Sequence, residues 1–141
     1  MTLKILWASK HKPLPNQIMW ITNNVTKDYE MYFCTSVLSA EWLIHHYIKP
    51  LKINIIIPVL PLSIIKTLHE KLNGKVQLWW PEMELVKTTI NNNTKINPNS
   101  EVAVKSYDEY GREIYKIYRF KRFLCIKEIN IVYEEIKNVK I

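Results

Sequence analysis

Short apolar segments alternate with helix-forming segments through the first 80 residues, and this alternation constrains the fold most. The apolar segments are Leu3–Ala8, Tyr29–Cys34, Ile53–Val59 and Lys75–Trp80. Short runs of β-branched and aromatic side chains with little alternation are typical of strands covered on both faces. We therefore predict an α/β fold of order βαβαβαβ, with a parallel sheet and helices on its faces.

Prolines and capping residues predict where the helices begin and end. The predicted helices cover residues 13–22, 41–47 and 61–72. The first and third begin at prolines, whose missing N–H costs nothing in a first turn. Ser36 or Ser39 could cap the second helix, and Lys49-Pro50 should end it, because a residue before proline avoids the α region. Asn73-Gly74 should end the third.

After Trp80 the pattern changes to that of an antiparallel hairpin. Asn91–Ser100 is polar and rich in asparagine, so we expect a mobile loop over about residues 88–101. Val102–Lys105 and Glu113–Phe120 read as strands on either side of a glycine-containing turn. Lys121–Val132 would extend the second strand or follow it as another. A single domain over residues 1–141 then has a parallel half and an antiparallel C-terminal hairpin.

Composition limits the classes of function. Lys and Arg number 20 against 13 Asp and Glu, a net charge of +7, which favours a polyanionic partner or serves solubility alone. Only Gly74 and Gly111 occur, so the glycine-rich nucleotide-binding motifs are absent. Cys34 and Cys125 lie in apolar runs and read as buried free thiols. We expect no cofactor, no metal site and no membrane span, and a cytoplasmic protein.

The end of the first predicted strand offers the best candidate site. Ser9, Lys10 and His11 follow Leu3–Ala8 directly, and ligands of such sheets bind at the carboxyl ends of the strands. His11 could act as a general acid or base, and Lys10 could neutralise phosphate. Backbone N–H groups opening the next helix could add an anion site. The alternative is that these are ordinary polar loop residues.

Two other strand ends should meet the first at the same edge of the sheet. Ser63 lies where the third strand turns into a helix, and could cap that helix or contact a ligand. Glu82 and Glu84 follow Trp79 and Trp80. These carboxylates face one side if the strand continues, and could act as acid and base or remain solvated.

The segment Tyr115–Phe123 interleaves basic and aromatic side chains. Strict alternation would place Arg119 and Lys121 on one face, and Phe120 and Arg122 on the other. Such a strand suits phosphate contact and base stacking. An edge strand protected by lysines has the same pattern.

The N-terminal strand with His11, Leu14 and Gln17 resembles small accessory proteins of the CRISPR-associated Rossmann fold (CARF) family. The basic-aromatic segment Ile117–Phe123 is similar to the strand that closes several of these chains. The resemblance implies a Rossmann-like domain that binds cyclic oligoadenylate, the messenger of type III CRISPR defence, and a homodimer around that symmetric ligand. Uncharacterised proteins of phages, archaeal viruses and plasmids share these features.

Some members of that family are metal-independent ring nucleases, in which a ribose 2′-hydroxyl attacks the adjacent phosphate. The resemblance implies that Ser9 and His11 position or deprotonate the hydroxyl. It also implies that Lys10, Arg119 and Lys121 hold phosphates. We expect the other ligand-binding residues of the cleft to be Gln17, Ser63, Glu82 and Glu84. Two alternatives remain, a non-catalytic nucleic-acid-binding accessory protein of a virus or plasmid, and a protein-interaction module or inhibitor.

Overall fold

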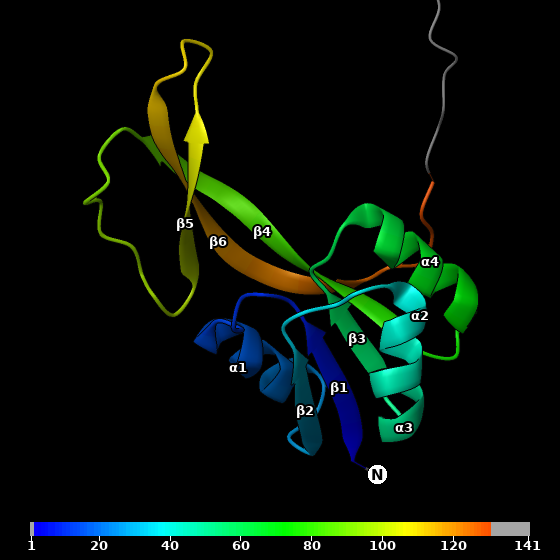
Figure 1. Ribbon diagram of the computed structural model, residues 1–141. Coiled ribbons are helices and arrows are strands. Elements are labelled where there is room, and N and C mark those ends of the chain that lie inside the picture. The colour runs from blue at the N-terminus through cyan, green and yellow to red at the C-terminus, as the bar shows by residue number, and fades with distance from the viewer. Residues whose placement is uncertain (1, 131–141) are drawn as a thin grey trace, which may run out of the picture.

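The computed structural model describes residues 2–130 and shows a mixed six-stranded sheet with helices on both faces of its parallel half (Figure 1). The strand order is β2-β1-β3-β4-β6-β5. The strands are β1 (Leu3–Ala8), β2 (Tyr29–Cys34), β3 (Ile55–Pro58), β4 (Gln77–Thr89), β5 (Glu101–Tyr107) and β6 (Glu113–Cys125). The helices are α1 (Pro15–Asn24), α2 (Ala40–Leu43), the π-helical turn η1 (Ile44–Ile48), α3 (Lys49–Leu51) and α4 (Leu62–Leu72).

The four N-terminal strands are parallel and alternate with helices, so the predicted fold class is confirmed. β1 lies between β2 and β3 and pairs with both. Leu6 and Ala8 of β1 belong to the core cluster under α2, η1 and α4, whereas Ile5 and Trp7 belong to the cluster under α1. Side chains of a strand point alternately to its two faces, which explains why β1 is apolar at almost every position.

The predicted end of the second helix at Lys49-Pro50 is wrong, because the chain stays helical to Leu51. The Lys49 N–H reaches back to the carbonyl of Ile44 across the π turn, and Pro50 occupies the first turn of α3, where it needs no hydrogen bond. Ser39 caps α2, with its Oγ accepting the Trp42 N–H at 3.1 Å.

The predicted end of the fourth strand at Trp80 is also wrong, because β4 is 13 residues long and ends at Thr89. β3 pairs with β4 only as far as Leu78, and beyond that point β4 pairs with β6 alone. Pro81 is tolerated because that part of β4 is an edge on the β3 side. β6 ends at Cys125, and the predicted continuation to Val132 reaches outside the described residues.

Two β-bulges bend the β4–β6 pair, one at Val86 of β4 and one at Lys121 of β6. A bulge adds one residue to one strand, so residues three apart come to face the same side. Phe120 and Phe123 are both buried in the cluster under α1 for this reason. The predicted strict alternation from Tyr115 to Phe123 is therefore wrong from Lys121 onward.

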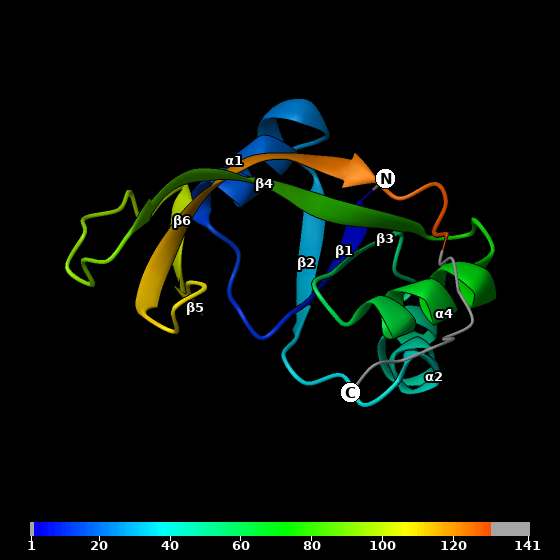
Figure 2. The ribbon, with the colours of Figure 1, turned by 90° about the horizontal axis from the view of Figure 1, so that it is seen from above.

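An aromatic cluster joins the two halves of the sheet. The Phe123 ring lies 6.5 Å from Trp7, 5.4 Å from Trp20, 6.0 Å from Trp79 and 5.0 Å from Phe120, measured between ring centroids. These contacts fasten β6 to β1 and α1, while the far ends of β4 and β6 carry β5 beyond the parallel half (Figures 1 and 2). Of the two cysteines predicted to be buried, Cys34 is buried and Cys125 is exposed.

Candidate functional site

A cavity of about 570 Å³ lies at the carboxyl ends of β1 and β3, facing the antiparallel strands. Its polar lining comes from the turn after β1, from the start of α1 and from the start of β5. These residues are Ser9, His11, Lys12, Gln17 and Glu101. Its apolar lining comes from every surrounding element: Trp7, Leu14, Val59, Pro81, Met83, Ile96, Pro98, Val102, Ala103 and Val104.

Hydrogen bonds on both sides fix the turn that follows β1. Ser9 is buried, and its Oγ accepts the backbone N–H of His11 at 3.1 Å. The Trp7 indole Nε1–H donates to the carbonyl of His11 at 2.7 Å. Because the backbone of His11 is held at both groups, its exposed imidazole has a defined starting position at the cavity. Ser9 therefore shapes the turn, and its oxygen is already engaged.

The backbone N–H groups at the start of α1 already have hydrogen-bond partners within the chain. Gln17 is buried, and its Oε1 accepts the Leu14 N–H at 2.7 Å, as in a capping box. The Asn16 N–H donates to the carbonyl of Asn99 at 2.9 Å, and Pro15 has no N–H. The expected anion site at this helix start is therefore wrong, because its donors are occupied within the chain. The side chain of Gln17 still borders the cavity.

The asparagine-rich loop forms one wall of the cavity, a role that its polar composition did not suggest. Ile96 and Pro98 line the cavity, and Asn99 holds the loop against α1. The Asn97 N–H donates to Glu101 Oε1 at 2.7 Å. The one sequence signal for this role is a pair of apolar residues inside a polar segment.

Carboxylates neutralise both arginines of the basic-aromatic strand. Arg119 Nη2 lies 3.1 Å from Glu101 Oε2, and Arg122 Nε lies 2.6 Å from Glu82 Oε2. The hydrogen bond from the Asn97 backbone, together with the Arg119 guanidinium, holds the pKa of Glu101 below its ordinary value. Glu101 is therefore ionised and paired at neutral pH, which leaves Lys12 as the unopposed charge on the cavity lining that the structure describes.

The structure brings only part of the predicted site together. Ser9, His11 and Gln17 line the cavity, whereas Lys10 is exposed beside it. The other five predicted ligand-binding residues do not line it: Ser63, Glu82, Glu84, Arg119 and Lys121.

The physical reasons for these misses differ. Ser63 is exposed in the first turn of α4, where it neither caps the helix nor reaches the cavity. Glu82 and Glu84 belong to the interior of β4, so the expected third loop at this edge does not exist. Lys121 is the bulged residue of β6 and is exposed.

No protein-family model, curated protein or solved structure matches this chain. Within residues 2–130, no helix is long and apolar enough to cross a membrane. The described residues also contain no group of three or more His, Cys, Asp or Glu side chains placed to hold a metal ion.

Proposed function

We propose that this protein binds a phosphorylated nucleotide in the cavity at the carboxyl ends of β1 and β3. The observation that carries the proposal is the pairing of a largely apolar lining with a positively charged, rigid turn. A base needs apolar contact, and a phosphate needs cations and N–H donors. Cyclic oligoadenylate is the ligand that the family resemblance suggests.

In the proposed complex, one part of the cavity contacts the base and another part contacts the phosphate. Met83 and Val102 would contact the faces of a base, and the Gln17 amide would contact its polar edge. Lys12 and the His11 ring would contact a phosphate, with exposed Lys10 adding longer-range attraction. A hydrogen bond to a charged group contributes about 1.5–3 kcal/mol, so loss of one such donor should weaken binding by at least about tenfold.

Cleavage of the ligand extends this proposal. In a ring-nuclease reaction the ribose 2′-hydroxyl gives its proton to His11 and attacks the adjacent phosphorus. The bond from phosphorus to the 5′-oxygen then breaks, the 5′-oxygen takes a proton from water, and the product carries a 2′,3′-cyclic phosphate. Lys12 would stabilise the charge that develops on the phosphate. Ser9 contributes by positioning His11, because its oxygen already accepts the His11 N–H.

Calorimetric titration with cyclic tetra-adenylate, cyclic hexa-adenylate and AMP tests the binding. We expect saturable heat with at least one ligand and a binding constant weakened about tenfold or more by Lys12→Ala. Lys27→Ala, which removes an exposed lysine between α1 and β2, is the matched control and should bind normally. An absence of heat with all three ligands would overturn the proposal.

Chromatography of the same samples tests cleavage separately. A 2′,3′-cyclic phosphate product that disappears in His11→Ala would support the nuclease extension. Binding without product would limit the function to ligand recognition. This second result would leave the binding proposal intact.

The nucleic-acid-binding alternative has weaker support. Phe120 and Phe123 are buried, so they offer no stacking surface, and Arg119 and Arg122 are paired with carboxylates. Strong, salt-sensitive binding of single-stranded RNA that Lys121→Glu abolishes would favour this alternative over the cavity.

A further inference from the structure

The outer edge of β5 is unpaired among the described strands. β5 lies at the end of the sheet and pairs with β6 on one side only. A free strand edge presents a row of N–H and C=O groups that can pair with another strand. Val104 is 46% exposed on this edge strand, which leaves apolar surface available beside the backbone groups.

Hydrogen bonds at the two ends of β5 show which backbone groups point outward. The Phe120 N–H donates to the carbonyl of Ser100, and the Asp108 N–H donates to the carbonyl of Arg112. Bonded and non-bonded pairs alternate along an antiparallel ladder, and the β5–β6 register has no shift. The even-numbered residues of β5 therefore bond to β6, and the N–H and C=O of Ala103 and Lys105 face outward.

The side chains along this edge are complementary to those of a second copy of β5 that runs in the opposite direction. Residues 100–106 read Ser-Glu-Val-Ala-Val-Lys-Ser. In an antiparallel pair of two such strands centred on Ala103, each valine faces a valine and Glu101 faces Lys105 of the second copy. The two Ala103 residues then exchange hydrogen bonds through the groups that point outward. Each Lys105 N–H meets the carbonyl of Glu101 in the other copy, while the Glu101 N–H keeps its bond to Asn97.

Charges along the same row support this register. Glu101 pairs with Arg119 at 3.1 Å, and Lys105 pairs with Glu113 at 2.9 Å. Placing Glu101 opposite Lys105 of a second copy would give alternating charges across four strands. Opposite charges directly across an antiparallel pair stabilise it, and like charges destabilise it.

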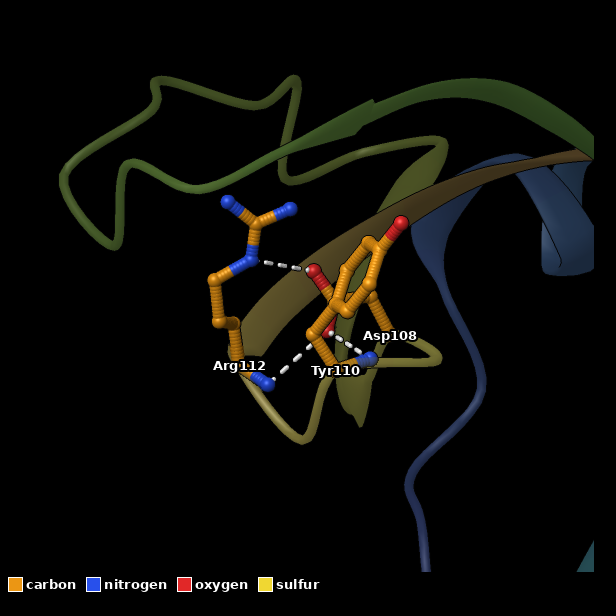
Figure 3. Close-up of polar contacts among 3 residues, drawn as sticks. All are labelled: Asp108, Tyr110 and Arg112. Atoms are coloured by element: carbon orange, nitrogen blue, oxygen red, sulfur yellow. Dashed lines mark hydrogen bonds and ion pairs between the residues drawn. The ribbon is translucent and has the colours of Figure 1, made fainter.

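The turn that follows β5 holds the strand in a fixed geometry (Figure 3). One carboxylate oxygen of Asp108 accepts the backbone N–H groups of Tyr110 at 2.9 Å and Arg112 at 2.8 Å, and the other accepts Arg112 Nε at 2.7 Å. Partial burial raises the pKa of Asp108, but the hydrogen bonds from Arg112 and Tyr110 outweigh it and leave the pKa below its ordinary value. A strand end that is already ordered loses little entropy when it pairs.

We infer that β5 pairs with β5 of a second copy, in an antiparallel twofold arrangement centred on Ala103, to form a homodimer. This interface goes beyond the proposed nucleotide site and does not depend on it. Val102, Ala103 and Val104 also line the cavity, so the second strand would run along one of its walls. Ligand binding and dimerisation should therefore affect each other, by the same factor in both directions.

Sedimentation over a range of protein concentrations tests the dimer. We expect a reversible monomer–dimer equilibrium that Ala103→Pro abolishes, since proline removes an outward N–H that β6 does not use. Lys105→Glu should weaken the dimer by roughly tenfold, because it places two like-charged pairs across the interface. Lys27→Glu makes the same charge change at a distant exposed site and should leave the equilibrium nearly unchanged. A wild-type protein that stays monomeric up to its solubility limit would overturn the inference.

Disulfide trapping tests the register. In a Cys125→Ser background, Ala103→Cys should cross-link with itself on oxidation, because residues facing each other in a bonded pair lie about 5.5 Å apart between Cα atoms. Val104→Cys is the control, since it would face Val102 and lie about 7–8 Å from its own counterpart. Equal cross-linking of both variants would contradict the twofold register. Ligand titration of the Lys105→Glu protein, whose substituted residue does not line the cavity, would read the nucleotide site separately from this result.

Discussion

Replacing Phe123 by alanine removes the ring that joins the two halves of the sheet. Phe123 is only 6% exposed and contacts aromatic rings from β1, α1, β4 and β6. A buried aromatic side chain removes roughly 150–250 Å² from water. At about 25 cal/mol per Å² this area is worth roughly 4–6 kcal/mol, of which the alanine methyl group keeps a small part. We therefore expect Phe123→Ala to lower the free energy of unfolding by about 3–5 kcal/mol.

Urea unfolding followed by far-UV circular dichroism measures this loss. Phe123→Leu fills most of the space, so its free energy of unfolding should fall by only roughly 1–2 kcal/mol. This milder variant keeps the effect measurable if the alanine variant is largely unfolded. Tyr110→Ala removes a ring that is 76% exposed, and should leave the unfolding midpoint nearly unchanged. A loss of under about 1 kcal/mol in Phe123→Ala, with an unchanged dependence on urea, would refute the proposed junction.

Three further predictions concern the polar groups around the cavity. Ser9→Ala leaves the part-buried backbone N–H of His11 without its acceptor, and should lower the free energy of unfolding in urea by about 1–2 kcal/mol. Gln17→Glu keeps an acceptor for the start of α1, so the thermal midpoint should hold while calorimetry shows weaker nucleotide binding from the added negative charge. The pKa of Glu101 is lowered by the Asn97 N–H and then by Arg119, so its contribution to stability is present above its ordinary pKa of 4.5 and is lost as pH falls through the lower folded value. Acid titration of Glu101→Gln should accordingly show a shallower loss of stability below that pH, and an unchanged slope would contradict the pairing.

The parallel half could be predicted because each of its elements carries a local signal. The apolar run Leu3–Ala8, the proline at Pro15 and the Asn73-Gly74 stop all act through neighbouring residues, and the structure places each of them as expected or within a few residues. The chain stayed helical through Pro50 because a π turn before it removed the need for its N–H. A π turn of that kind does not show in the spacing of the apolar residues, so the sequence pattern does not predict it.

The antiparallel half and the complete cavity could not be predicted because they depend on contacts between distant residues. Pro81 ends a strand by ordinary rules, yet it is accommodated where β3 stops and one side of β4 has no strand neighbour among the described residues. The bulge at Lys121 reverses the expected faces of the residues that follow it. The cavity needs Val102 and Ile96, which lie about 90 positions from His11 in sequence.

The resonance of the Trp7 indole N–H gives the most direct test of the nucleotide site. This group donates to the carbonyl of His11 at 2.7 Å, inside the turn proposed to bind phosphate. Trp42 packs in the core cluster on the opposite face of the sheet and is an internal reference. In a ¹H–¹⁵N spectrum of the labelled protein, saturating cyclic oligoadenylate should shift the Trp7 indole signal and leave the Trp42 signal in place. A ligand that binds yet leaves Trp7 unmoved would contradict the account.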